Sequence, residues 1–263
     1  MNFEKVGLVL SGGGTKGIAH AGVLKFLIEK NIDVDILSCC SAGSIVGCLY
    51  AIGKTPEEIL QFFNSVYFFN WKHFAFNQPG LVSSVIFRNY LKPIFHDMKL
   101  KDLNKEVKIV ATELVAGTQK IFDENFEVVD AIIASCSIPG ITTPYILGDE
   151  MYCDGGVLNN FPADIIRDEC DNLIGIFVSP PNNIDIKDLK TIKAIVSRSY
   201  DLLSYRIEKI KFDYCDWFIS SQELATYGTF ERRSDRMEEM FMIGYKAAKE
   251  SFAESCFYSE VKN

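Results

Sequence analysis

The chain has 263 residues, 48% of them hydrophobic, and a formal net charge of −8. This length and composition predict one large α/β domain, or at most two small ones. The acidic balance argues against nucleic acid as a partner and against strong electrostatic docking on an anionic membrane. A neutral lipid or ester substrate is compatible with it.

The eight cysteines are scattered and form no CxxC pair, so the sequence indicates neither a zinc site nor a redox motif. Most of them lie in apolar or small-residue segments, as buried free thiols do, although their even number leaves disulfides formally possible. The first apolar run is too short for a signal peptide, and no stretch is long enough to span a bilayer. We expect a cytoplasmic protein whose membrane contact is at most peripheral.

The first motif is SGGGTKG at residues 11–17, between a predicted buried strand at 6–10 and a mostly buried helix at 18–30. Its glycine amides suit a nucleotide phosphate or the oxyanion of a tetrahedral intermediate. The first interpretation is weak, because Asp33 and Asp35 precede the second strand instead of closing it. A tight turn without chemistry is disfavoured by three consecutive glycines, each of which raises the entropy of the unfolded chain.

The second motif is a serine turn. Val34 and Ile36–Leu37 lead into it as a predicted buried strand, and residues 42–52 leave it at helical length. Between them lies Ser41, surrounded by small residues. A serine at a tight strand-to-helix turn exposes its hydroxyl for attack, close to the first amides of the helix.

The middle of the chain predicts several elements without chemistry of their own. Thr55-Pro56-Glu57-Glu58 predicts a capped helix start, with the helix running to about Tyr67. The aromatic residues at 67–76 indicate core packing by base rate, with a mobile cover over an acyl pocket as the alternative. The next predicted elements are a helix at 82–95, strands at 107–112 and 119–122, a helix at 128–135, and a short hairpin of 145–147 and 151–153.

The third motif is Asp154-Gly155-Gly156, at the end of that hairpin. Alone it predicts an ordinary Asp-Gly turn; beside the serine turn and the glycine loop, Asp154 becomes the best candidate base. The chain continues with a predicted strand at 173–178 and a long helix at 188–212. The basic residues of that helix favour a solvated face over a membrane or partner surface. A last strand at 216–219 and an amphipathic helix at 235–252 follow.

These three motifs, in this order, resemble the patatin-like phospholipase family, in its bacterial-type form with a stand-alone patatin domain. The resemblance implies a single domain over 1–263 with a three-layer α/β/α fold and a mostly parallel central sheet. It implies Ser41 as nucleophile and Asp154 as base, with the amides around Gly12, Gly13 and Gly14 as the oxyanion hole. Lys16 takes the place of a basic residue usual in the family's loop. No metal or organic cofactor is implied.

The sequence departs from the family pattern at Cys39, which replaces the first glycine of GxSxG; that glycine lets strand and helix pack closely at the turn. His20 lies in an apolar helix and is interpreted as a packed, hydrogen-bonded residue. Asp154 as base requires a poorly solvated site in contact with Ser41.

We therefore expect a serine hydrolase of lipid or acyl esters that works through an acyl-enzyme, as a phospholipase A, lysophospholipase or esterase. The alternative is a non-catalytic lipid-binding or regulatory protein that keeps the fold, and Cys39 alone supports it. The substrate's head group and the oligomeric state are left open.

Overall fold

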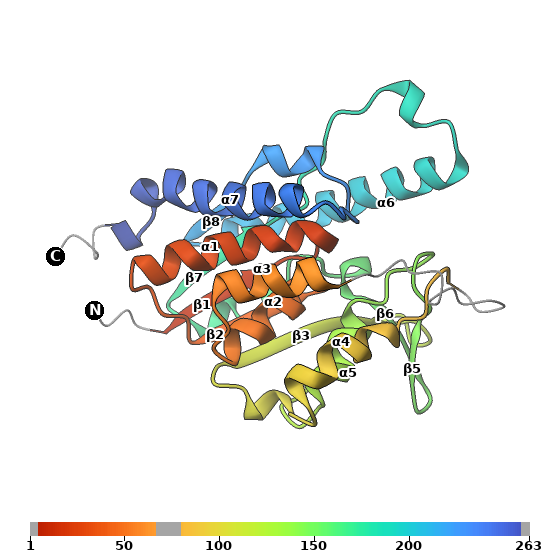
Figure 1. Cartoon of the computed structure of the whole chain (residues 1–263), viewed down its shortest axis with the longest axis horizontal. Coiled ribbons are helices and arrows are strands. Elements are labelled where there is room, and N and C mark those ends of the chain that lie inside the picture. Colours follow the sequence, from red (N-terminus) through yellow and green to blue (C-terminus); the bar gives the residue numbers. More distant parts are fainter. Residues whose placement is uncertain (1–4, 67–79, 259–263) are drawn as a thin grey trace.

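The computed structural model describes residues 5–66 and 80–258. Within these ranges an eight-stranded mixed sheet has the order β5-β6-β3-β2-β1-β7-β8, with β4 paired to β3 (Figure 1). Its strands are β1 (Val6–Leu10), β2 (Ile36–Cys40), β3 (Glu106–Glu113), β4 (Thr118–Ile121), β5 (Tyr145–Leu147), β6 (Glu150–Asp154), β7 (Asn172–Phe177) and β8 (Trp217–Ser220). The apolar runs of β1 and β2 are fully buried, as expected of central parallel strands.

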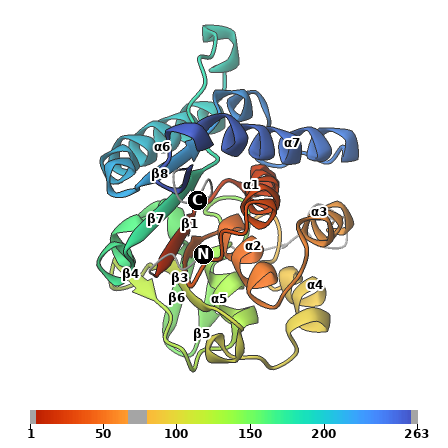
Figure 2. The ribbon, with the colours of Figure 1, turned by 90° about the vertical axis from the view of Figure 1, so that its left-hand side faces the viewer.

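Helices cover both faces of the sheet, in three layers (Figure 2). They are α1 (Ile18–Glu29), α2 (Ala42–Ala51), α3 (Pro56–Ser65), α4 (Ile86–Phe95), α5 (Val128–Ser135), α6 (Ile192–Glu208) and α7 (Ser234–Ser251). The larger core joins one face of the sheet to α1, α2, α5 and α7. A smaller core on the other face contains Phe161 and Phe177, packed against Tyr205 of α6 and Phe212. The predicted three-layer α/β/α fold is confirmed.

Strand pairing around β3 brings two chain segments end to end. β2 is parallel to β3 up to the pair Cys40 and Val110. From Val110 to Glu113, β4 pairs with one side of β3, so β6 must use the other side, which is the side of β2. Asp154, the last residue of β6, pairs with Ala111. β2 and β6 therefore run toward each other along the same side of β3, and their ends meet.

Two predicted helices have different bounds in the structure. The helix predicted at 82–95 begins at Ile86, because Val82 forms a parallel bridge with Thr142 and its backbone is not free for a helical turn. The helix predicted at 188–212 begins after Thr191, whose hydroxyl accepts from the amide of Ala194. It ends at Glu208 and continues as a 3-10 helix at 209–214.

The remaining predicted strands and helices are present, with ends shifted by a few residues. The capping box of Thr55 and Glu58 is formed as predicted. All eight cysteines are free and five are buried, which confirms the interpretation of most as buried thiols. In the described ranges, no helix combines the length and apolar character needed to cross a membrane. The aromatic stretch at 67–76 lies outside the described residues.

Helices α1 and α7 touch through their backbones, and this contact gives the first testable prediction. A β-carbon added to Gly244 would lie 2.0 Å from the carbonyl oxygen of Ala19. Gly244→Ala is therefore expected to lower the free energy of unfolding by about 1–3 kcal/mol, the usual effect of overpacking, despite the better helix propensity of alanine. Denaturant unfolding measures the change.

The matched control is Gly228→Ala, since nothing lies within 4 Å of a β-carbon placed there. It is expected to change the free energy of unfolding by less than about 0.5 kcal/mol. Equal stability of Gly244→Ala and the wild type would show that the two helices are not in backbone contact.

Candidate active site

Ser41 forms the whole turn between β2 and α2. Its backbone has φ 49° and ψ −124°, a conformation that costs energy for a residue other than glycine. The amide of Ser41 donates a 2.8 Å hydrogen bond to the hydroxyl of Ser135, which in turn donates to the carbonyl of Val110 at 2.6 Å. The last residue of α5 thus holds the strained turn against β3. Sequence reasoning predicted the helix at 128–135 but gave Ser135 no role.

Cys39, the departure from the family pattern, fits because α2 has a glycine opposite it. A β-carbon added to Gly47 would lie only 2.5 Å from the sulfur of Cys39. The thiol therefore fills the space that Gly47 leaves between strand and helix, and the turn at Ser41 keeps its shape. Burial raises the pKa values of the Cys39 and Cys40 thiols well above their usual range. Both stay protonated at neutral pH, which argues against either as the nucleophile.

Asp154 is in direct contact with Ser41. The hydroxyl of Ser41 donates to Oδ2 of Asp154 at 2.5 Å, and the amide of Gly156 donates to Oδ1 at 2.8 Å. The backbone of Asp154 is fixed on both sides, since its amide donates to the carbonyl of Ser137 and its own carbonyl accepts from Thr112. This is the poorly solvated contact that a carboxylate base requires.

Burial sets the protonation of this pair. Ser41 and Asp154 are 5% and 6% exposed. Loss of solvation raises the pKa of Asp154 from 3.8 to about 6, against the opposing effect of the hydrogen bonds from Ser41 and Gly156. The carboxyl is thus still ionised at neutral pH, yet a stronger base than an exposed aspartate.

The glycine loop lies beside Ser41, but its three candidate amides are not equivalent. The amide of Gly12 donates to the carbonyl of Asn160 at 3.1 Å, so it is already engaged. Within residues 5–66 and 80–258, the amides of Gly13 and Gly14 have no hydrogen-bond partner. Gly14 adopts φ +58°, which only glycine takes readily. Gly13 and Gly14 are thus available to an anion, and Gly12 anchors the loop.

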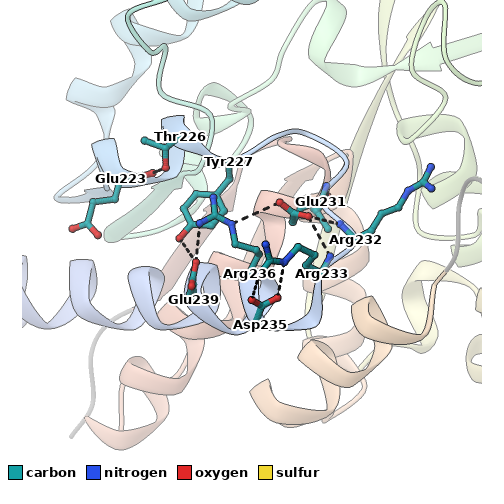
Figure 3. A network of polar contacts seen from close by, with 10 residues as sticks. Glu223, Thr226, Tyr227, Glu231, Arg232, Arg233, Asp235, Arg236 and Glu239 are labelled. Carbon is teal, nitrogen blue, oxygen red and sulfur yellow. Dashed lines mark hydrogen bonds and ion pairs between the residues drawn. The ribbon is translucent and has the colours of Figure 1, made fainter.

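Thr15 ties this loop to the segment that precedes α7. Its amide and its hydroxyl both donate to the carbonyl of Thr229, and its hydroxyl accepts from the amide of Glu231. Figure 3 shows the polar contacts of this segment with α7. The guanidinium carbon of Arg236 lies 4.0 Å from the ring centroid of Tyr227, and the hydroxyl of Tyr227 donates a hydrogen bond to Glu239. A network of exposed contacts therefore fixes the far side of the glycine loop.

A pocket opens next to Ser41, and its lining is mostly apolar. The residues come from the turn at Ser41, from α2, α3 and α4, from the 3-10 turn at 14–17, and from the segments at 82, 136–142 and 230. They are Gly14, Thr15, Ser41, Ala42, Ile45, Phe63, Val82, Ile86, Phe87, Cys136, Ile138, Ile141, Thr142 and Phe230. The lining thus joins Ser41 and Gly14 to a set of apolar side chains.

Glu208 is a site residue that sequence reasoning missed. Its carboxylate is 1% exposed and accepts from the amides of Asn160 and Phe161, and the ammonium of Lys211 donates to it at 2.8 Å. The interpretation of the basic segment as a solvated face is therefore wrong for Lys211. A Glu and a Lys three residues apart are also typical of exposed helices, so sequence alone does not separate the two cases.

The two other polar residues near the loop are buried. His20 donates from Nε2 to the carbonyl of Ser11 at 2.8 Å, and burial lowers its pKa to about 4. This confirms the interpretation of His20 as a packed, hydrogen-bonded residue. Burial also lowers the pKa of Lys16, although the charge of Asp201 opposes the shift.

The comparisons with known proteins identify the family of this chain. The family model described as patatin-like phospholipase matches residues 8–167. The chain belongs to the patatin-like phospholipase family. The resemblance stated from the three motifs is thereby confirmed.

Relatives of this chain are found in animals, fungi, bacteria and viruses. It is 30% identical to patatin-like phospholipase domain-containing protein ZK370.4 of Caenorhabditis elegans, over 62% of this chain and 12% of that protein. It is 32% identical to lysophospholipase NTE1 of Debaryomyces hansenii, over 62% of this chain and 11% of that protein. Uncharacterized protein R571 of Acanthamoeba polyphaga mimivirus is 27% identical, over 92% of both chains.

Most of these relatives are longer than this chain. The matched region spans 12% of the length of the worm protein and 29% of the length of an NTE family protein of Mycobacterium bovis. Among solved structures, VipD of Legionella pneumophila aligns with a TM-score of 0.66 and 14% identity, over 97% of this chain and 67% of that one. At that identity the likeness shows the fold alone.

The fit of Cys39 against Gly47 gives the second prediction. Gly47→Ala is expected to destabilise the patatin-like fold by about 1–3 kcal/mol, because the new methyl group meets the sulfur of Cys39. Cys39→Ala in the same protein removes that sulfur, so the double variant should regain most of the loss. Denaturant unfolding of the four proteins measures the coupling energy, expected near 1–2 kcal/mol. Additive effects of the two substitutions would contradict the contact.

Proposed function

We propose that this protein is a serine hydrolase of lipid esters that uses Ser41 and Asp154 as a dyad. The observation that carries the proposal is the 2.5 Å hydrogen bond from the Ser41 hydroxyl to Asp154, at a strained strand-to-helix turn. A buried carboxylate in direct contact with a serine hydroxyl is the arrangement that activates a nucleophile without histidine.

The reaction proceeds in two halves. Asp154 takes the proton of the Ser41 hydroxyl while the oxygen of Ser41 attacks the acyl carbonyl carbon. The carbonyl oxygen becomes an oxyanion. The bond to the alcohol then breaks, and Asp154 returns the proton to that leaving oxygen. Water attacks the acyl-enzyme in the same way: Asp154 accepts its proton, the ester bond to Ser41 breaks, and the proton restores the serine hydroxyl.

The amides of Gly13 and Gly14 would hold the oxyanion in both halves, because they have no hydrogen-bond partner among the described residues. Gly12, which sequence reasoning grouped with them, has its amide bound to Asn160 and would keep the loop in place. The two remaining donors lie on a loop fixed by Thr15, so they need little reorganisation during the reaction.

The substrate class rests on the apolar pocket beside Ser41 and on family membership. A pocket lined by Ile45, Ile86 and Phe87 suits an acyl chain, and a fungal relative carries the name lysophospholipase. We propose phospholipid or lysophospholipid esters as substrates, hydrolysed in the cytoplasm by one domain over 1–263 without metal or organic cofactor. The alternative of a non-catalytic lipid-binding protein depended on Cys39, and the fit of Cys39 over Gly47 removes that support.

The third prediction concerns both members of the dyad. Ser41→Ala and Asp154→Asn are each expected to abolish hydrolysis of a short-chain ester and labelling by a fluorophosphonate probe, with losses of at least about 1,000-fold. Retained turnover in both variants would contradict the proposal.

The stability of Asp154→Asn serves as a control for misfolding. Burial raises the pKa of Asp154 from 3.8 to about 6, so the ionised carboxylate destabilises the folded state at neutral pH. The neutral amide is therefore expected to raise the free energy of unfolding there by up to about 3 kcal/mol. Lost activity together with a raised melting temperature separates a catalytic defect from misfolding.

The fourth prediction is the pH dependence of kcat/KM. The base must be ionised, so activity on a soluble ester should rise with pH and level off above the Asp154 pKa of about 6. His20, whose pKa is lowered to about 4, does not titrate near pH 6. Stability has the opposite trend: the contribution of Asp154 is present below pH 3.8 and is lost as pH rises to about 6. A flat rate profile across this range would contradict the role of Asp154.

A further inference from the structure

The outer face of α6 is an apolar stripe exposed to solvent. Five aliphatic side chains of α6 at helical spacing form it, and Ile210 of the 3-10 helix that follows extends it. Their exposed fractions lie between 49% and 83%: Ile192, Ile195, Val196, Leu203, Ile207 and Ile210. Figure 1 shows α6 reaching, with its N-terminal end, beyond the sheet at the side where β1 and β2 end. A helix normally buries its apolar stripe, and within the described residues nothing covers this one.

The inner face of the same helix touches the candidate active site. Glu208 holds the amide of Asn160, and the carbonyl of Asn160 holds Gly12 of the glycine loop. The hydroxyl of Tyr200 lies 3.3 Å from the position of a β-carbon at Gly156, next to Asp154. The exposed stripe is thus attached to the catalytic loops by short contacts, and α6 has a fixed position relative to Ser41.

Two basic residues lie at the apolar stripe, whereas Arg198 of α6 bonds Asn182. Arg206 lies within the stripe, between Leu203 and Ile210, and Lys209 follows at its border. The acidic residues of the helix face the other way: Glu208 is buried, and Asp201 lies near Lys16. Apolar side chains edged by basic ones are typical of a helix that lies in a membrane interface.

We propose that α6 docks on a lipid bilayer, with its stripe inserted among the acyl chains and the catalytic site held at the surface. This rests on the proposed function, because only a lipid substrate requires the protein to meet a bilayer. A second copy of the chain fits less well, since a symmetric contact would bury the guanidinium of Arg206 against apolar side chains. At a bilayer the long arginine side chain reaches the headgroups instead.

The sequence favoured a solvated face for this helix over a membrane surface, and the proposed docking favours the membrane surface. The chain carries a net charge of −8, so its whole-molecule field repels an anionic membrane. Attachment must therefore come mainly from apolar insertion, with Arg206 and Lys209 adding a local, salt-sensitive attraction to anionic headgroups.

Vesicle flotation of the Ser41→Ala protein tests the docking without hydrolysis. The vesicles are phosphatidylcholine alone and an equimolar mixture with phosphatidylglycerol. We expect binding to both, stronger to the mixture, with the increment lost at high salt. Leu203→Gln with Ile207→Gln is expected to weaken binding at least about tenfold. The control, Ile28→Gln with Ile121→Gln, removes two aliphatic side chains of α1 and β4 that are 46% and 44% exposed, and it should bind like the parent.

The other outcomes are distinguishable. Absence of vesicle binding, or equal losses in both double variants, would overturn the docking. So would a change from dimer to monomer on sedimentation with vesicle binding unaltered, which would make the stripe a contact between copies. In the protein that retains Ser41, the α6 variant should hydrolyse a soluble ester at the parent rate. Vesicle binding by a protein without esterase activity would contradict the proposed hydrolase function and would still support the docking.

Discussion

One side of strand β3 is shared by two strands that approach from opposite directions, and the candidate active site depends on that pairing. β4 occupies the other side of β3 from Val110 onward, which leaves β6 only the continuation of the β2 edge. Ser41 leaves the sheet where β2 ends, and Asp154 ends β6 one position further along β3. The hydrogen bond between them is therefore a consequence of sheet topology, and Ser135 secures it by bonding both Ser41 and Val110.

The site holds the carboxylate of Asp154 where solvation is poor. Hydrogen bonds reduce the free-energy cost of burying its charge without removing that cost. Asp154 accepts from Ser41 and Gly156, yet its pKa remains raised, so folding works against the ionised state at neutral pH. The neighbouring thiols of Cys40 and Cys136 stay protonated, because burial and the charge of Asp154 both raise their pKa values. Asp154 is thus the group that accepts a proton most readily beside Ser41.

Helix α6 illustrates how one element serves two environments. Its inner face carries Glu208, a buried carboxylate that organises the amides around Asn160, and its outer face carries the apolar stripe. In the sequence these two patterns overlap with basic residues and read as an ordinary solvated helix. Burial of Glu208 and Lys211 depends on residues 159–161, which lie about 50 positions earlier in the chain.

The sequence by itself determined the elements and the motifs: the buried strands, the capped helix after Thr55, the serine turn and the Asp-Gly-Gly turn all follow from local pattern. Local pattern is sufficient there because dihedral preference and burial periodicity act over a few residues. Only the tertiary structure decided which glycine amide is free, since Gly12 is engaged by Asn160 across the chain. It also decided that Cys39 fits at the turn, because its sulfur occupies the space over Gly47, and packing between distant atoms cannot be inferred from either residue alone.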